Sequence, residues 1–489
     1  MNPVEGQNAS ERNSRAKSGG LAVFAFLSRS LQQIAALVIT LLAARFLLPV
    51  EYGVYTLSIV FVTLIQTMTY TGFYHFIVTQ KGDEDAILST SFWMLTGLAF
   101  VGSAIFAVLS SPISWLFEAP DLARVLLLLC LLQPIAGITA WYSAVLLRRQ
   151  KMTLHFAIMF SQNALALIVG AILLVTWQSI FALVAFRAVR VLSAFVLYLV
   201  FSHDRPTLRF DTKLARQALG YSASLYGSKF MNFLSRYGGD LILGLVYSTA
   251  ESGLYRFGNR VATGATDIVT QPMSNFALTQ FGACNRNDKP IGHALERFVG
   301  VTVLLIGAVS AVVLVLGEAV VSAFFRPEYL AALGVTYAFA MRALFGVGLH
   351  FLTPALSALD QTKVLFYFET FLAISIITAI AVAAPFGLVT LAWAQAFTTL
   401  AASVAAFIVM RRVTDVDVSG ACRAFITAAI LAFIYGIFLY ITWTYFISTL
   451  HLAEGLLIAI GICASFVSFL PLLAVGKKLR VFTLQVFSG

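Results

Sequence analysis

Charge is scarce in this sequence: Asp, Glu, Lys and Arg make up only 11% of its 489 residues, whereas 60% are hydrophobic. Soluble globular proteins carry about 25% charged residues. Long polar loops are scarce as well, since stretches between the apolar runs stay below roughly fifteen residues. Together these two shortages exclude a soluble multidomain protein and leave no room for a separate soluble domain.

Cysteine is also rare, with four residues at Cys130, Cys284, Cys422 and Cys463. They are scattered through the chain, which does not suggest a disulfide framework or a metal site. The six histidines likewise lack the spacing of metal ligands. We therefore expect no metal and no other cofactor.

What the chain does have is apolar runs of the length that crosses a membrane, which takes ~20 residues per helix. They predict an all-α polytopic membrane protein with about fourteen transmembrane helices. The expected windows are 20–47, 52–78, 86–110, 121–147, 153–176, 179–202, 215–247, 250–281, 295–325, 329–358, 363–384, 387–411, 421–449 and 453–475. The seventh and eighth windows are the least hydrophobic of the set.

The net charge of +10 follows the membrane topology. With the N-terminus in the cytoplasm, the outer turns hold only Arg45, Arg124 and Arg326, and the other loop cations face inward. This is the pattern of the positive-inside rule, and it places both termini in the cytoplasm. Because topology accounts for most of the basic charge, we expect no nucleic-acid partner.

A short word occurs twice at a spacing of 200 residues: EYGVY at 51–55 and ESGLY at 251–255. Comparing 21–80 with 221–280 also matches Arg29 with Lys229. We interpret this as a duplicated six-helix unit in parallel orientation. The word is expected in an outer turn, with the glycine allowing the turn, the glutamate near the next helix start and the tyrosine in the interfacial belt.

The resulting architecture has two parallel six-helix lobes and two additional helices. We predict a cytoplasmic tail at 1–19, an N-terminal lobe at 20–202, a C-terminal lobe at 203–415, two additional transmembrane helices at 416–476 and a cytoplasmic tail at 477–489.

Charges inside apolar spans are costly and therefore mark candidate sites. The cations predicted to bind substrate are Arg29, Arg187, Arg190, Lys229, Arg236, Arg256 and Arg260. Arg256 and Arg260 stand one helical turn apart, as do Arg187 and Arg190, so each pair makes sense if an anion comes to it. Snorkelling to the headgroups is the alternative for Arg29, Lys229 and Arg256.

Three embedded acids are candidates for ion coupling: Asp240, Asp267 and Glu369. Asp240 stands four residues after Arg236, so the two can form a structural ion pair, or Asp240 can hold a coupling proton or cation. Asp267 follows Arg260 by two turns and can compensate its charge. Arg342 and Glu369 are isolated, which favours a structural role for each.

Two lobes, a cationic interior and no soluble domain indicate a transporter of an anion. So many cations on several helices suit a large amphiphile with a diphosphate and a bulky polar group better than a small anion. The segment AARFLLPVEYGVYTL at 43–57 resembles the first outer turn of the bacterial polysaccharide and O-antigen flippases, the polysaccharide-transporter branch of the MOP superfamily. The resemblance covers the whole chain, and Arg29 matches the recurring basic residue of that family's first helix.

The resemblance implies a V-shaped bundle that alternates between inward- and outward-open states in the bacterial inner membrane. Its expected substrate is an undecaprenyl-diphosphate-linked oligosaccharide, moved to the periplasmic leaflet for O-antigen or exopolysaccharide synthesis and coupled to H⁺ or Na⁺. Expected partners are membrane lipids, a polysaccharide polymerase and a chain-length regulator. No enzymatic activity is expected.

Two alternatives remain open. One is a drug or metabolite exporter of the MATE type, although such proteins typically have twelve helices and acidic sites. The other is a membrane polysaccharide polymerase or glycosyltransferase, although those usually carry a large outer loop with catalytic groups.

Overall fold

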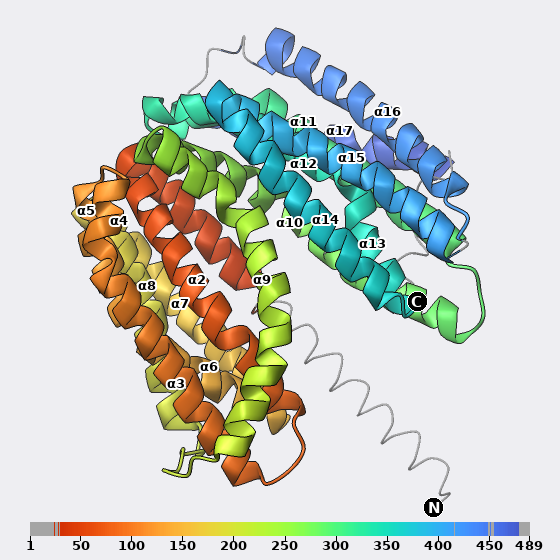
Figure 1. The fold of residues 1–489 in the computed structure, drawn as a ribbon. Helices are drawn as coiled ribbons and strands as arrows, with labels where there is room; N and C mark the ends of the chain where they lie inside the picture. Colours follow the sequence, from red (N-terminus) through yellow and green to blue (C-terminus); the bar gives the residue numbers. More distant parts are fainter. Residues whose placement is uncertain are drawn as a thin grey trace, which may run out of the picture. The chain divides into compact units, whose positions relative to one another are not determined.

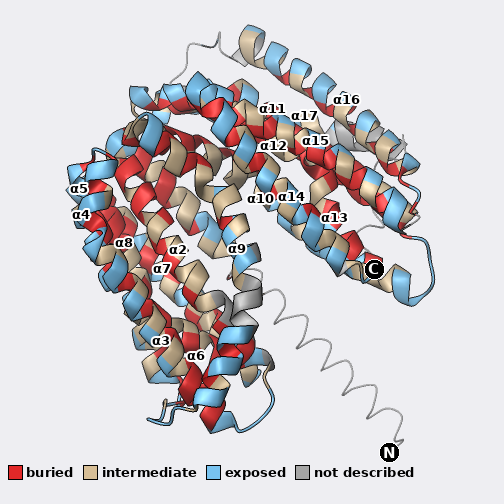
Figure 2. Ribbon diagram, viewed as in Figure 1, coloured by how far each residue is buried: buried red, intermediate tan, exposed pale blue. Residues whose placement is uncertain are grey.

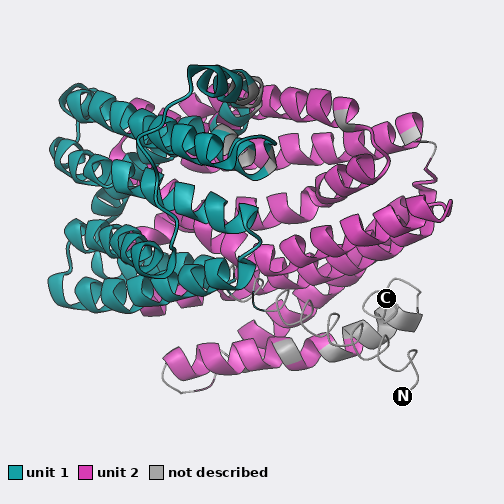
Figure 3. Ribbon diagram, turned by 90° about the horizontal axis from the view of Figure 1, so that it is seen from below, with its two compact units in different colours: residues 1–233 teal, residues 234–489 magenta. Residues whose placement is uncertain are grey.

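Helices make up the regular structure of the computed structural model (Figure 1), which describes residues 24, 28, 30–414, 416–447, 450 and 454–478. Within these ranges there is no β-strand, in agreement with the all-α prediction. Contacts divide the chain into two compact units, unit 1 at Met1–Phe233 and unit 2 at Leu234–Gly489, coloured separately in Figure 3. Each unit is described by itself below.

Unit 1 contains a helix at Ser30–Phe46 followed by seven complete labelled helices and the first part of α9. Their bounds are α2 Pro49–Thr79, α3 Glu84–Val108, α4 Ser110–Leu116, α5 Pro120–Leu131, α6 Gln133–Arg148, α7 Met152–Trp177, α8 Ile180–Phe201 and α9 Thr212–Val246.

Unit 2 takes the rest of α9 and the elements after it. These are α10 Thr249–Arg286, α11 Gly292–Phe324, the 3₁₀-helix η1 Pro327–Ala332, α12 Leu333–Phe345, α13 Val347–Ala358, α14 Thr362–Ala383, the 3₁₀-helix η2 Ala384–Phe386, α15 Leu388–Thr414, α16 Ser419–Thr442, the π-helix η3 Trp443–Ile447 and α17 Glu454–Lys478.

Most of each predicted window lies on helix where it is described, and the fourth and tenth windows contain an interruption, at Leu132 and at Gly346. Among the described residues, nine helices are long and apolar enough to cross a membrane, and the pair Pro327–Phe345 and Val347–Ala358, bent by 40°, makes up to ten. Two shorter apolar helices, Ser30–Phe46 and Gly455–Phe469, match the first and last windows. The helices α9 and α10 are long but too polar to pass that test, as expected of the seventh and eighth windows. The exact number of crossings stays a prediction.

The division between the units falls inside α9 and not in the linker that follows α8. That linker is tied to the start of α3: Arg209 pairs with Asp83 at 2.7 Å, and Trp93 Nε1 donates to the Thr207 carbonyl at 3.0 Å. The Ala86 N–H and Arg209 together hold the pKa of the Asp83 carboxyl below its usual range. The predicted six-helix lobe boundaries, with a division at 202/203, remain a prediction.

The prediction that the repeated word lies in a turn was wrong. Pro49 begins α2, and Glu51 accepts a hydrogen bond from the Leu48 N–H at 2.8 Å, so the helix is already under way when the word begins. Ser248 caps α10 by accepting from the Glu251 N–H at 3.2 Å. Both words therefore lie inside helices and their glycines make no turn. The expected place of the two glutamates, in the first turn, is confirmed.

The duplication is also visible in matching contacts between the first two helices of each copy. In unit 1 the Tyr52 hydroxyl donates to Thr40 Oγ1 at 3.3 Å, and in unit 2 Ser252 Oγ donates to the Asp240 carbonyl at 3.1 Å. Sliding the chain by 200 residues brings these pairs into register. Helix pairs meet at equivalent positions in the two copies.

Each unit has its own packed core, seen as the buried faces in Figure 2. The core of unit 1 centres on Phe73 and Trp141, whose Nε1 donates to the Leu88 carbonyl at 2.9 Å. In unit 2 the largest cluster joins α10, α11, α13, α15 and α16 around residues such as Phe281 and Phe351. Exposed side chains on α7 and α16 are largely apolar, as a membrane-spanning helix requires.

The fourth span of each copy is broken. Helices α5 and α6 are separated by Leu132, and Gln133 and Pro134 follow the break. Helices α12 and α13 are separated by Gly346. Interrupted helices at corresponding positions of two repeats commonly mark substrate sites in transporters.

Candidate functional site

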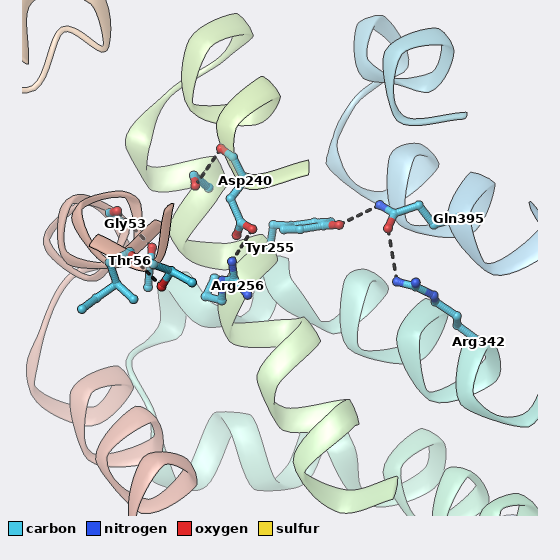
Figure 4. Close-up of polar contacts among 10 residues, drawn as sticks. Gly53, Thr56, Asp240, Tyr255, Arg256, Arg342 and Gln395 are labelled. Atoms are coloured by element: carbon cyan, nitrogen blue, oxygen red, sulfur yellow. Dashed lines mark hydrogen bonds and ion pairs between the residues drawn. The ribbon is translucent and has the colours of Figure 1, made fainter. Parts of the chain in front are cut away.

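The embedded charges of unit 2 are organised around one buried ion pair (Figure 4). Asp240 on α9 is paired with Arg256 on α10, and the side chains are 0% and 17% exposed. The guanidinium also lies over the Tyr237 ring, 4.8 Å from its centroid. The structure pairs Asp240 with Arg256 across two helices and not with Arg236, the partner that the spacing of four residues offered, and Arg236 is exposed.

A second embedded acid of unit 2, Asp267, lies on α10 two turns after Arg260. Asp267 accepts a hydrogen bond from Thr270 at 3.3 Å and lies in electrostatic range of both Arg236 and Arg260. It therefore compensates part of the charge of Arg260, as the spacing of seven residues suggested. The cations Arg256 and Arg260 each face a carboxylate within unit 2.

A hydrogen-bonded chain, also drawn in Figure 4, links α10 to two further helices of unit 2, α12 and α15. Arg342 on α12 donates through Nη1 to Gln395 Oε1 at 3.2 Å and through Nε to Thr399 Oγ1 at 3.1 Å. Gln395 Nε2 in turn donates to the Tyr255 hydroxyl at 2.6 Å. Tyr255 is only 2% exposed, so its predicted place in the interfacial belt was wrong.

The arginines of unit 1 have different surroundings. Arg187 and Arg190 lie in the middle third of α8 and are half-buried. Arg187 Nη2 donates to Gln66 Oε1 at 3.4 Å, while its Nε is buried without a hydrogen-bond partner among the described residues. Gln66 Nε2 donates to Gln133 Oε1 at 3.0 Å, next to the break in the fourth span.

Carboxylates are distributed unevenly between the two units. The described acidic residues of unit 1 all stand in loops or in the first turn of a helix: Glu51, Asp83, Glu84, Asp85, Glu118, Asp121, Asp204 and Asp211. The embedded candidates Asp240, Asp267 and Glu369 all belong to unit 2. Within the described part of unit 1, the mid-span pair Arg187 and Arg190 thus has no carboxylate to offset its charge.

The remaining predicted site residues are not gathered into these clusters. Lys229 is exposed on α9, and Glu369 is exposed on α14. Arg29 lies outside the described residues. No group of three His, Cys, Asp or Glu side chains in the described ranges has an arrangement that holds a metal ion.

Sequence reasoning missed the amide side chains of both clusters. Gln133 and Gln395 are 0% and 1% exposed, and each lies inside an apolar window. A buried amide in a membrane span must find partners, which is a signal that the sequence already carried.

Comparison with known proteins identifies the family. A family model described as "Polysaccharide biosynthesis protein" matches residues 42–334. The chain belongs to this polysaccharide biosynthesis protein family. Two curated relatives are the succinoglycan biosynthesis transport protein ExoT of Rhizobium meliloti (strain 1021), 22% identical over 69% of this chain and 68% of the relative, and the amylovoran biosynthesis protein AmsL of Erwinia amylovora, 24% identical over 60% and 76%.

Solved structures show which fold this family member has. The lipid II flippase MurJ in an inward closed conformation matches with a TM-score of 0.75 at 15% identity, covering 94% of this chain and 99% of MurJ. An inward-facing multidrug resistance MATE transporter of the MOP superfamily matches with a TM-score of 0.62 at 11% identity, covering 78% and 94%. This member of the polysaccharide biosynthesis protein family is thus an integral membrane protein with the MOP-type fold.

Proposed function

We infer that this protein is a flippase for a lipid-linked oligosaccharide used in polysaccharide synthesis. The observation that carries the proposal is the mid-span pair Arg187 and Arg190, which has no carboxylate partner in the described part of unit 1. A charge at mid-membrane costs about 2.5–3.5 kcal/mol on insertion scales. Two such charges three residues apart also repel each other. An anionic ligand offsets both costs.

The chemistry of the pair favours a diphosphate. Each guanidinium presents a planar set of donors that matches phosphate oxygens, and two arginines suit the two phosphates of a lipid diphosphate. Gln66 orients Arg187 through its amide oxygen, so the donors are held before the ligand arrives. The substrate is then an undecaprenyl-diphosphate-linked oligosaccharide whose lipid tail stays in the bilayer.

The relatives support a role in polysaccharide synthesis. Their names assign succinoglycan and amylovoran biosynthesis to them, and the structural neighbour MurJ is a lipid II flippase. Repeat units built on the cytoplasmic leaflet must reach the other leaflet before they are assembled outside. The chain is proposed to carry them from the cytoplasmic to the periplasmic leaflet of the bacterial inner membrane. A polymerase and a chain-length regulator would take over from it.

Coupling to an ion is the next step of the proposal. Asp240 has one carboxylate oxygen on Arg256 and the other buried without a hydrogen-bond partner among the described residues. A buried carboxylate of this kind can accept a proton or a cation. Asp240 is therefore the first candidate for H⁺ or Na⁺ coupling, with Asp267 and Glu369 as further candidates. If the protonated or cation-bound protein prefers either the inward-open or the outward-open state, ion binding would drive the change between these two states.

A leaflet assay tests the transport claim. Purified protein is reconstituted with labelled lipid-diphosphate oligosaccharide, and exposure of the glycan to an external glycosidase is followed. We expect wild type to accelerate exposure and Arg187→Gln/Arg190→Gln to lose at least about tenfold of that rate, because two charge-assisted contacts disappear. Arg124→Gln is the matched control, since that exposed arginine lies at the start of α5, outside the apolar core.

Either of two results contradicts the proposal. If the double variant, shown to be folded by size-exclusion chromatography, transports as well as wild type, the arginine pair is not the anion site. If wild type moves no lipid-linked glycan but exports small cations, the protein is an exporter of the MATE type.

A further inference from the structure

Unit 2 places an arginine at the break of its fourth span. Arg342 stands in the last turn of α12, and Gly346 separates that helix from α13 at the 40° bend. Neither the sequence pattern nor the family assigns a ligand to this arginine. The position lies well inside the apolar run that both half-helices form.

The guanidinium of Arg342 is held in a fixed orientation. Nε donates to Thr399, Nη1 donates to Gln395, and the group lies over the Phe339 ring at 5.4 Å from its centroid. Gln395 Nε2 donates to the Tyr255 hydroxyl at 2.6 Å, and a reversed amide would set its NH₂ group against the Arg342 Nη1 donor. Buried neighbours thus preset the direction in which the charge points.

The charge of Arg342 is not neutralised by an ion pair among the described residues. No carboxylate among the described residues pairs with Arg342, and its partners are a hydroxyl and an amide. Arg342 is half-buried, and its Nη2 is not among the buried atoms that lack a hydrogen-bond partner. Arg236, the nearby charge, is also a cation. Donors on Nη1 and Nη2 therefore remain open to a ligand.

Unit 1 also contains a hydrogen-bonded arginine and glutamine, but its arginine lies on the sixth span and not on the fourth. There Arg187 stands on the sixth span, Gln66 on the second and Gln133 beside the break of the fourth. In unit 2 the arginine stands on the fourth span and the glutamine on the sixth. An arginine–glutamine chain across the second, fourth and sixth spans thus exists in both copies, although different positions supply the arginine.

We propose that Arg342 is a second oxyanion site, which binds a carboxylate group carried by the glycan. This proposal rests on the proposed function, since it concerns the cargo of the same transporter. A single planar guanidinium matches the two oxygens of one carboxylate. The cargo is therefore an acidic oligosaccharide.

Calorimetric titration of the full chain in lipid nanodiscs at neutral pH tests the site. The probes are D-glucuronate, neutral D-glucose and inorganic pyrophosphate. We expect glucuronate to bind more tightly than glucose, and Arg342→Gln to weaken glucuronate binding by about tenfold or more. Pyrophosphate binding is expected to stay unchanged in this variant and to weaken in Arg187→Gln/Arg190→Gln.

Two milder variants keep the test decisive if Arg342→Gln does not fold. Arg342→Lys keeps the charge but loses the planar fork, and Thr399→Val keeps the arginine but removes the acceptor of its Nε–H. Both are expected to weaken glucuronate binding about threefold or more, because orientation is lost. Unchanged affinity in both would overturn the proposal.

The outcomes separate the two claims. Equal binding of glucose and glucuronate, no glucuronate binding by wild type, or full glucuronate binding by folded Arg342→Gln overturns the carboxylate site. Absence of pyrophosphate binding to wild type, together with glucuronate binding that depends on Arg342, instead removes the diphosphate assignment and leaves the carboxylate site standing.

Discussion

At the scale of single residues, the ion pair of Asp240 and Arg256 differs from the surface ion pairs because it is buried. Surface pairs such as Arg124 with Asp121 are exposed and contribute little to stability. Asp240 is fully buried, so removal of Arg256 leaves an uncompensated charge inside the protein. The equivalent positions of the first copy hold Thr40 and Thr56, which are neutral. The pair is therefore a feature that the second copy has and the first does not.

This comparison yields a stability prediction. Arg256→Gln is expected to lower the free energy of unfolding by about 3–5 kcal/mol, because Asp240 is left buried and charged. Asp240→Thr/Arg256→Thr, which installs the residues of the first copy, is expected to cost less than the single change. Denaturant unfolding in detergent micelles measures both. A double variant less stable than Arg256→Gln would contradict the interpretation.

Residue spacing alone could not predict which arginine pairs with Asp240. An arginine side chain is long enough to reach Asp240 from either position: Arg236 lies on the same helix, α9, and Arg256 lies on the neighbouring helix, α10. Spacing along one helix favoured Arg236. Cross-helix packing decided for Arg256, because a buried carboxylate gains more from a partly buried guanidinium than from an exposed one.

At the scale of helices, α13 and α15 approach each other closely just after the break in the fourth span of unit 2. Gly348, two residues after the break at Gly346, lies against α15, and its N–H donates to Ser403 Oγ at 2.9 Å. A Cβ atom at this position would lie 2.7 Å from the Ser403 carbonyl oxygen. Glycine is thus required by the neighbouring helix and not by an unusual backbone angle.

We therefore expect Gly348→Ala to destabilise the protein by about 1–3 kcal/mol through overpacking. Gly97→Ala is the matched control: the site is also helical, nothing lies within 4 Å of its Cβ, and alanine favours a helix. Thermal unfolding followed by intrinsic fluorescence compares the two. Equal melting temperatures would show that α13 and α15 do not pack as described.

Helix starts show how far local sequence signals reach. Pro49 and Ser248 are standard first-turn and capping residues, and they begin α2 and α10 just before the repeated words. Giving these signals more weight than the glycines would have placed the words inside helices. The duplication itself was evident from the residues at 51–55 and 251–255, because it needs only a register and no geometry.

At the scale of the whole molecule, charge distribution predicts orientation in the membrane. Basic residues concentrate in alternate loops and at the helix ends beside them, including Arg286 at the end of α10 and Lys289 in the loop before α11. The positive-inside rule therefore predicts that this loop lies on the cytoplasmic side.

Cysteine labelling tests this orientation. In a background with the four native cysteines replaced by serine, Asp121→Cys is expected to react with a membrane-impermeant maleimide in intact spheroplasts. Lys289→Cys is expected to react only after the membrane is opened, because both residues are exposed but on opposite sides. Labelling of Lys289→Cys in intact spheroplasts, with Asp121→Cys protected, would reverse the topology.

The sequence by itself determined the membrane class, most of the helical windows and the set of embedded charges, and it predicts the duplication. These depend on composition and on patterns along the chain, which apolar burial in a bilayer makes unambiguous. Only the tertiary structure decided which charges neutralise each other: Asp240 pairs with Arg256, while Arg187 and Arg342 are held by neutral side chains. Such pairing depends on contacts between helices far apart in sequence, and those distances are set by packing and not by spacing.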